Sequence, residues 1–373
     1  MKALLLWLCI AFTCNAEITT QTVPTSPNAT HDWVHPRIGR FPDGQYIMTS
    51  QKTYWLANDV FYGIGYTFFK DVKKAIAPTK VDSALKNTVS KNGVERSFSD
   101  AWPAYHAKSG KMLLIGHSVY YKNLTLLPAK TRPRETLYSV FDRAKKTWSK
   151  PAVLKMPVGF EQAGAGSVQR YDLPNGDILL PIYYRDKKSG FYRIVVATCG
   201  FNGKVMVVKK LGASMGLANG RGIVEPSIIY HGGKYWITIR NDSTAYYANS
   251  NDGLSWSTLR QWRFSDTGEV INSYNTQSHF AVIYSKLFLI YTRSNDFGKD
   301  VPRDRSPLFM AKIDTKTGLI DAASEVVVMP YSKAKFGNFG VVSDGHGSVI
   351  ISDSEWRYVG GVDTNNIYLT TVN

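Results

Sequence analysis

Residues 220–242, GRGIVEPSIIYHGGKYWITIRND, read as two β-strands joined by a tight turn. β-Branched and aromatic residues alternate on both sides of the HGG turn, which is typical of a hairpin. Glu225 lies near the start of the first strand, and Arg240 ends the second strand fifteen residues later. Neither charge suits the core of a simple hairpin. The spacing is therefore informative if it recurs.

The same order of strand, turn and strand recurs along the chain. It is found in RIGRFPDGQYIMTSQK (37–52), WPAYHAKSGKMLLIGH (102–117), QRYDLPNGDILLPIYY (169–184), SHFAVIYSKLFLIYTR (278–293) and FGVVSDGHGSVIIS (339–352). No helical period of comparable strength accompanies these hairpins. Related hairpins that start about 60 residues apart indicate a repeat architecture.

Radial repetition of small sheets predicts a single all-β propeller over residues 17–373. Each hairpin would supply the two inner strands of a four-stranded blade. YRIVVATCGF (192–201) and SPLFMAKIDT (306–315) are predicted outer strands. The hairpin count favours six blades, and seven is the alternative if the stretch 53–100 hides another. SNDGLSW (250–256) predicts a structural turn in which Asp252 accepts hydrogen bonds from backbone amides while Trp256 packs inward.

The N-terminus has the pattern of a cleaved secretory signal. Lys2 precedes the apolar run ALLLWLCIAF, and small residues lead to a predicted cleavage after Ala16. The run is too short to span a bilayer, so we expect a secreted or periplasmic protein without stable membrane insertion. Only Cys199 remains after cleavage, which excludes a disulfide framework. We expect Cys199 to be a small buried residue, with a structural metal site shared with histidines as the alternative. No cofactor is required.

The chain is strongly basic. Its formal charge is +16, and removal of Lys2 with the signal leaves about +15. An exported protein of this charge favours anionic polysaccharides or oligosaccharides as partners over nucleic acids. A solvated basic surface on a monomer is the structural alternative.

The recurring hairpins also predict a site. Equivalent positions on successive blades of a propeller form a ring around its axis, so side chains at one position converge on one mouth. With Glu225 as position zero, Arg37 occupies that position in another blade. Position fifteen is occupied by His117, Tyr184, Arg240 and Arg293. Charged groups gathered around a channel are costly to bury unless they bind a ligand.

Several motifs carry a family resemblance. RGIVEPS, IRND, SNDGL, SYNTQSH, YTR, RDRSPLF and GNFG resemble a sialidase-like propeller group of exported bacterial proteins, over roughly residues 100–357. Similar propellers include ulvan lyases and an oligosaccharide dehydratase of ulvan breakdown. By this resemblance His117 and Tyr184 correspond to the catalytic His and Tyr, and Arg193 to the arginine that neutralises the substrate carboxylate. The implied substrate is a sulfated, uronic-acid-containing glycan.

True sialidases give a rival interpretation. They use three arginines on the substrate carboxylate, a tyrosine nucleophile polarised by a glutamate, and an aspartate acid/base. The motifs match Arg37, Glu225 and Arg240 to this set, and Arg293 is the candidate for the third arginine. Asp59 and Asp71 are the candidates for the acid/base. A tyrosine near residue 330 has no clear motif, and His117 and Tyr184 have no role in this mechanism.

Elimination does use the histidine and the tyrosine. The weakly acidic C5 proton of a uronate can be removed when a cation stabilises the charge that forms on the carboxylate. We therefore predict a carbon–oxygen lyase, either a polysaccharide lyase or a dehydratase of a terminal uronate, with a sialidase-type glycosidase and a non-catalytic glycan-binding propeller as alternatives. The predicted catalytic residues are His117, Tyr184, Arg193 and Arg240. The predicted substrate-binding residues are His106, Arg37, Glu225, Arg293, His279 and Arg303, with Arg305 as a further sulfate contact.

Each candidate also has a structural explanation. A strand-end histidine such as His117 or His106 can be held by hydrogen bonds, and Tyr184 is one of 22 tyrosines. Glu225 and Arg240 could simply pair and lock two strands, and a buried pair is weak support for function by itself.

Overall fold

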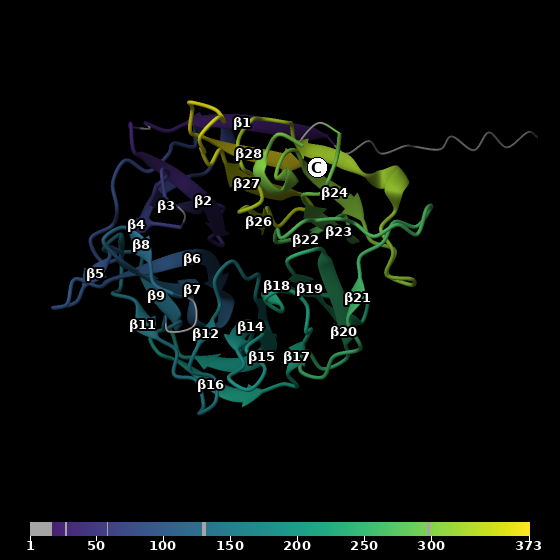
Figure 1. The fold of residues 1–373 in the computed structure, drawn as a ribbon, viewed down its shortest axis with the longest axis horizontal. Coiled ribbons are helices and arrows are strands. Elements are labelled where there is room, and N and C mark those ends of the chain that lie inside the picture. The colour runs from purple at the N-terminus through teal and green to yellow at the C-terminus, as the bar shows by residue number, and fades with distance from the viewer. Residues whose placement is uncertain (1–16, 27, 58, 129–131, 297–298) are drawn as a thin grey trace, which may run out of the picture.

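The computed structural model describes residues 17–26, 28–57, 59–128, 132–296 and 299–373. Strand accounts for 50% of the chain and helix for 3%, so the all-β prediction is confirmed. Figure 1 shows small antiparallel sheets arranged in a ring, which is a propeller arrangement. The predicted signal peptide, residues 1–16, lies outside the described residues.

The first three sheets follow the chain around the ring. The first contains β2 (His31–Arg40), β3 (Tyr46–Tyr54) and β4 (Phe61–Phe69). The second contains β5 (Thr88–Val89), β6 (Glu95–His106), β7 (Lys111–Lys122), β8 (Thr125–Leu126), β9 (Thr136–Asp142), β10 (Thr147–Trp148) and β11 (Ala152–Val153). The third contains β12 (Ala163–Gly164), β13 (Tyr171–Asp172), β14 (Ile178–Arg185), β15 (Tyr192–Phe201), β16 (Met206–Leu211) and β17 (Met215–Gly216).

The other three sheets have four strands each. The fourth sheet contains β18 (Val224–His231), β19 (Lys234–Arg240), β20 (Ala245–Ser250) and β21 (Arg260–Gln261). The fifth contains β22 (His279–Ile283), β23 (Lys286–Tyr291), β24 (Leu308–Lys312) and β25 (Val326–Met329). The sixth contains, in spatial order, β1 (Ile18–Pro24), β28 (Asn366–Val372), β27 (Val349–Ser354) and β26 (Gly340–Ser343). Four single-turn 3₁₀ helices lie between strands: η1 (Val72–Lys74), η2 (Ala107–Ser109), η3 (Pro302–Asp304) and η4 (Ala322–Ser324).

The predicted blade description differs from this arrangement. Five of the six sheets have the four or more strands of a full blade, and the β2–β3–β4 sheet has three. The stretch 53–100 does not form a seventh blade, because it supplies β4, β5 and the start of β6 to neighbouring sheets. Five of the six predicted hairpins are present as β2–β3, β6–β7, β18–β19, β22–β23 and β26–β27. The sixth, at residues 169–184, is present only as the two-residue pairing of β13 with β14. Both predicted outer strands are also present, as β15 and β24.

The core consists of apolar clusters between and within the sheets. In the largest cluster, Cys199 of β15 is fully buried, and burial raises the pKa of its thiol to about 12. Cys199 is thus a core residue, as expected. Among the residues that the structure describes, no group of three or more His, Cys, Asp or Glu side chains could hold a metal ion, so the metal alternative for Cys199 has no support there.

The SNDGLSW turn forms as predicted. Asp252 Oδ1 accepts hydrogen bonds from the backbone amides of Leu254 (2.8 Å) and Ser255 (2.7 Å), which lower the pKa of Asp252 to about 2. Gly253 has a φ of 73°, which suits glycine. Trp256 packs against the largest core cluster. The turn therefore has a structural role.

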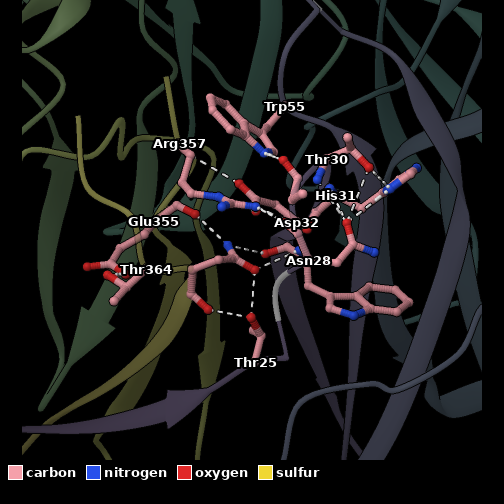
Figure 2. A network of polar contacts seen from close by, with 12 residues as sticks. Thr25, Asn28, Thr30, His31, Asp32, Trp55, Glu355, Arg357 and Thr364 are labelled. Carbon is pink, nitrogen blue, oxygen red and sulfur yellow. Dashed lines mark hydrogen bonds and ion pairs between the residues drawn. The ribbon is translucent and has the colours of Figure 1, made fainter. Parts of the chain in front are cut away.

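The ring closes where the two ends of the chain meet. β1 pairs along its whole length with β28, so the first described strand completes the last sheet. Beside this pairing lies a polar network that joins both ends of the chain (Figure 2). In it, the guanidinium of Arg357 lies 2.6 Å from the carboxylate of Asp32, and both side chains are nearly inaccessible to solvent. Arg357 also donates to the backbone oxygen of Asn28 at 2.8 Å.

Candidate functional site

One cavity of about 630 Å³ lies at the end of the propeller where β18 begins and β19 ends. Its lining is strongly cationic. Three acidic residues, Asp59, Asp100 and Glu225, line the cavity. They are outnumbered by seven arginines: Arg132, Arg134, Arg185, Arg221, Arg240, Arg303 and Arg305. A concave site with this excess of positive charge suits an anionic ligand.

A repeated backbone feature directs polar side chains into the cavity. The inner strands β2, β6 and β18 each contain a register shift, between Val34 and Arg37, Ser99 and Trp102, and Val224 and Ser227. Such bulges re-aim side chains and are frequent beside active sites.

The residues at these bulges have left-handed backbone conformations. The φ values are 53° for His35, 54° for Asp100 and 47° for Glu225. The equivalent segments of the next sheets add Ser167 (φ 55°) and Asn275 (φ 57°). All five line the cavity. Because each left-handed non-glycine residue costs roughly 1–2 kcal/mol, five at one cavity indicate a functional site.

In two hairpins a bulged acid faces a basic side chain on the next strand, fifteen residues later in one hairpin and seventeen in the other. In the β18–β19 hairpin the bulged Glu225 lies 2.5 Å from Arg240, at the end of the next strand. In the β6–β7 hairpin the bulged Asp100 lies 3.0 Å from His117, which lies within the next strand rather than at its end. Of the four residues predicted to face one cleft, His117, Glu225 and Arg240 line this cavity and Tyr184 does not. Sequence reasoning missed Asp100, because the bulge places it two residues before the aligned Trp102.

A chain of hydrogen bonds runs through His117. Its Nε2 lies 3.0 Å from Asp100 Oδ2, and its Nδ1 lies 2.8 Å from the hydroxyl of Tyr183. Because the carboxylate can only accept, Nε2 carries the proton, and Nδ1 accepts the hydrogen bond that Tyr183 donates. Asp100 thus fixes the tautomer of a histidine that is poised to receive a proton from Tyr183.

The electrostatics of the cavity agree with this arrangement. Burial lowers the pKa of His117, so the ring is neutral, and Asp100 partly opposes that effect. Burial alone would raise the pKa of Asp100, but the hydrogen bond from His117 and the proximity of His35, whose Nδ1 lies 3.1 Å from Asp100 Oδ1, hold it well below its ordinary value. Burial raises the pKa of Tyr183, and the nearby Arg134 opposes that rise.

Arg134 and two glycines pack tightly around this chain. The guanidinium of Arg134 lies 4.9 Å from the ring centre of Tyr183 and 5.1 Å from that of Tyr192. A Cβ atom on Gly166 would lie 2.8 Å from the His117 ring, and one on Gly164 would lie 2.7 Å from the Arg134 side chain. Glycine is therefore required at both positions for the cluster to form.

The prediction of Tyr184 as a cavity residue is wrong. Tyr184 does not line the cavity, and its hydroxyl lies 2.7 Å from Ser214 Oγ. Arg193 pairs with Tyr184 across β14 and β15 and donates from Nε to the same Ser214 oxygen at 2.8 Å. Successive side chains of a strand point to opposite faces, so the alignment, one residue out of register, chose the wrong face. Tyr183 is the tyrosine of the cavity.

Four other candidates lie elsewhere. Arg293 pairs with Glu325 at 2.6 Å beside a separate cavity, so the predicted ring does not include it. Arg37 is fully buried below the cavity, donates to Ser167 at 2.9 Å and packs on Trp102. His106 is held by the backbone oxygen of Gly176 and by Ser109, each at 2.8 Å. His279 is fully buried, with its Nδ1 2.6 Å from Ser227 Oγ.

The opposite wall is organised by Asn275. Its side-chain oxygen accepts from Arg240 Nε at 2.9 Å and from Arg221 at 2.8 Å. Its backbone oxygen accepts from Arg303 at 3.3 Å. Arg303, a predicted substrate-binding residue, therefore lines the cavity, and Arg305 lines it too. Burial would raise the pKa of Glu225, but Arg240 and Arg221 hold it below its ordinary value.

The sialidase set is present only in part. Asp59 lines the cavity, whereas Asp71 caps η1 by accepting from Lys73 N at 2.9 Å. The tyrosine nearest residue 330, Tyr331, is exposed and donates to Asp300. It does not line the cavity.

Comparisons with known proteins identify the fold. No protein-family model matches the chain. No curated protein matches it either. A solved protein of unknown function from Dyadobacter fermentans is similar over 95% of this chain and 99% of its own, with 13% identity and a TM-score of 0.69.

Solved sialidases share the same architecture. Trypanosoma rangeli sialidase is similar over 95% of this chain, with 16% identity and a TM-score of 0.65. This chain spans only 58% of the length of that sialidase. The NanB sialidase from Streptococcus pneumoniae is similar over 94% of this chain and 70% of its own, with 12% identity and a TM-score of 0.61. The chain therefore has a sialidase-like propeller fold. Within its described part, none of the helices is long and apolar enough to cross a membrane.

Proposed function

We propose that this protein is a carbon–oxygen lyase that acts by β-elimination on saccharides that contain uronic acid. The proposal rests on the Asp100–His117–Tyr183 chain in a cavity that arginines line. Tyr183 takes the part that the sequence assigned to Tyr184. Arg134 takes the part of Arg193, because it is the arginine that lies against the Tyr183 ring.

The chain of hydrogen bonds can move the protons that an elimination requires. Tyr183 passes its hydroxyl proton to His117 Nδ1 and removes the C5 proton of the uronate. The electron pair of the C5–H bond forms the C4–C5 double bond, and the C4–O4 bond breaks. His117 or Tyr183 then returns a proton to O4. Asp100 stabilises the imidazolium that forms in between.

The arginines supply the electrostatic part of the mechanism. Negative charge develops on the uronate carboxylate as the C5 proton leaves, and cations placed beforehand stabilise it most strongly. Arg134 is next to the proton-transfer chain, so it is the residue that we place on the reacting carboxylate. Arg240, which the sequence also offered, is held by Glu225 and Asn275 on the other wall.

The same residues serve two outcomes. If O4 belongs to a glycosidic bond, the product is a shorter chain with an unsaturated end. If O4 is a terminal hydroxyl, the product is water and the reaction is a dehydration. The sequence resemblance favours sulfated ulvan-type glycans as substrates, and the proposed location of the enzyme is outside the cytoplasm, because residues 1–16 have the pattern of a signal peptide.

A substrate panel tests the proposal. Purified protein is incubated with ulvan, ulvan oligomers, alginate and polygalacturonate. We expect ultraviolet absorbance of a new C4–C5 double bond with at least one of them, and mass spectrometry separates cleavage from loss of water. Turnover without that absorbance would contradict elimination.

A sialidase-type glycosidase is the second candidate. It is favoured by the fold and by the presence of Asp59, Glu225 and Arg240 in one cavity. Its nucleophile would have to be one of the two cavity tyrosines, Tyr183 or Tyr192. The hydroxyl of Tyr183 is hydrogen-bonded to His117 rather than to Glu225, which weighs against that role for Tyr183. Release of the fluorophore from a sialic acid glycoside would favour this candidate. Glycan binding with neither reaction would indicate a non-catalytic propeller.

A further inference from the structure

We infer that the substrate carries two anionic groups, and that Arg303 and Arg305 bind the second of them on the cavity wall opposite Arg134. This inference rests on the proposed function for the placing of the reacting uronate at Arg134. The second group is a sulfate ester or a second carboxylate on a neighbouring sugar.

The first observation is the pairing state of the arginines. Arg240 and Arg221 each have a carboxylate partner, Glu225 and Asp242. Within the described part of the chain, no carboxylate forms an ion pair with Arg132, Arg134, Arg303 or Arg305. These four all line the cavity. Arg305 is buried and the other three are partly buried. Cations withdrawn from water without an ion-pair partner are costly unless a ligand supplies the counter-charge.

The second observation is that the four arginines form two pairs on opposite sides. Arg132 and Arg134 precede β9, and Arg303 and Arg305 precede β24, so each pair lies in the connection that leads to the third strand of a hairpin sheet. In Figure 1 these two sheets face each other across the ring. A single carboxylate at one pair would leave the other without a partner.

The members of each pair lie two residues apart in the sequence and repel each other. Burial and the nearby Arg303 together lower the pKa of Arg305 to about 9. Burial also lowers the pKa of Arg132, with Arg134 adding to the effect. An anion between the members of a pair would relieve this repulsion, and the planar guanidinium suits carboxylate and sulfate equally.

The backbone at the second pair is also strained. Arg303 has a φ of 64° and Asp304 has a φ of 48°. Two successive left-handed residues are uncommon outside sites where the surroundings enforce them. They bring the Arg303 side chain over the backbone oxygen of Asn275, at the cavity wall.

The test is a binding experiment that needs no turnover. The Tyr183→Phe protein is titrated by calorimetry with methyl glucuronide, digalacturonate, an unsulfated chondroitin disaccharide and its singly sulfated form. We expect the second anionic group to raise affinity about tenfold or more. Preference for the sulfated disaccharide identifies a sulfate site, and preference for digalacturonate identifies a second carboxylate site.

Arginine variants in the same background locate the two sites. Arg303→Gln should remove the gain from the second anion and leave the affinity for methyl glucuronide unchanged. Arg134→Gln should weaken every ligand. Arg143→Gln, which removes one positive charge from the surface, should change neither the affinity for methyl glucuronide nor the gain from the second anion.

Two results would overturn the inference: equal affinity for ligands with one and two anionic groups, or an equal loss for all ligands in Arg303→Gln. Failure of the proposed reaction appears separately, as binding of the dianionic ligands without any elimination by the wild-type protein.

Discussion

Two groups of buried charge in this propeller are built in opposite ways. At the ring closure, Arg357 donates to Asp32 and to backbone oxygens, and the network in Figure 2 gives these groups partners from both ends of the chain. In the cavity, Arg134 and Arg303 have no ion-pair partner among the described residues, and two of the three acids there, Asp100 and Glu225, lie on strained bulges. The closure network is complete by itself, so it serves the fold. The cavity arginines lack such partners, and under the proposed function an anionic ligand supplies them.

The largest effect should come from the proton-transfer chain. We expect Tyr183→Phe to lower the rate of elimination by roughly 10²–10⁴-fold, the usual contribution of a placed acid–base group. Tyr184→Phe is the matched control, because its hydroxyl bonds Ser214 outside the cavity. It should keep a rate close to that of the wild type. Rates on a uronate polymer, with thermal unfolding as the check on folding, decide the matter. Similar rates for the two variants would remove Tyr183 from the mechanism.

The next effect separates stability from activity. Arg357→Gln leaves the buried Asp32 without its charge partner, so we expect the free energy of unfolding to fall by about 3–5 kcal/mol. Denaturation in urea measures this change, and the activity per folded molecule should be unchanged. Arg134→Gln should do the reverse, with a large loss of activity and a change in stability of less than about 1 kcal/mol. If Arg134→Gln unfolds as readily as Arg357→Gln, the contrast between the two groups is wrong.

Much of the fold could be predicted from the sequence, because the signals that define it are local in the sequence. Turn residues and alternating strands lie close together in the sequence, so the hairpins, the outer strands β15 and β24 and the Asp252 turn were all recognisable. The number of strands in each sheet could not be recognised, because short edge strands such as β8, β11 and β17 pair without a strong sequence pattern. Their partners are fixed only by the assembled ring.

The site was predictable only where spacing survives the bulges. His117, Glu225 and Arg240 were found because they occupy equivalent positions in recurring hairpins. Tyr183 was missed because a shift of one residue changes the face of a strand. Asp100 and Arg134 lie on a bulge and in a connection, and nothing in a hairpin pattern shows where such segments point.

The pH dependence gives a smaller but more specific effect. Burial lowers the pKa of His117, so the imidazole is neutral near neutral pH, and activity should fall only on the acid side. Asp100 raises the pKa of His117 against that burial, so Asp100→Asn should move the acid limb of the rate profile to lower pH. A limb that stays in place would mean that His117 does not control it.

The stability of the fold should follow the same group. The folded pKa of His117 lies below its unfolded value near 6.5, so the unfolded chain binds more protons as the pH falls below that value. The stability that neutral His117 contributes is present above about pH 6.5 and is lost as the pH falls toward the folded pKa. Thermal unfolding across this range measures it, and His117→Asn should flatten the dependence.

The smallest expected effect tests whether ligand binding depends on where a positive charge lies or only on the net charge of the protein. Arg143 lies 2.5 Å from Asp43, and both side chains are about half exposed, at 48% and 46%. Exposed pairs of this kind contribute at most about 1 kcal/mol, so Arg143→Gln should change the free energy of unfolding by less than that.

Arg143→Gln removes the same formal charge as Arg303→Gln. Arg143, however, lies just after the end of β9, at the opposite end of that strand from the cavity. Because salt at 0.1 M screens exposed charges over roughly 10 Å, Arg143 should contribute little to the affinity for a bound saccharide. Titration of both variants with one anionic ligand at two salt concentrations compares them directly. If they lose affinity equally, binding reflects the net charge of +16. If only Arg303→Gln loses affinity, the cavity recognises the ligand through arginines that the fold has placed and left open.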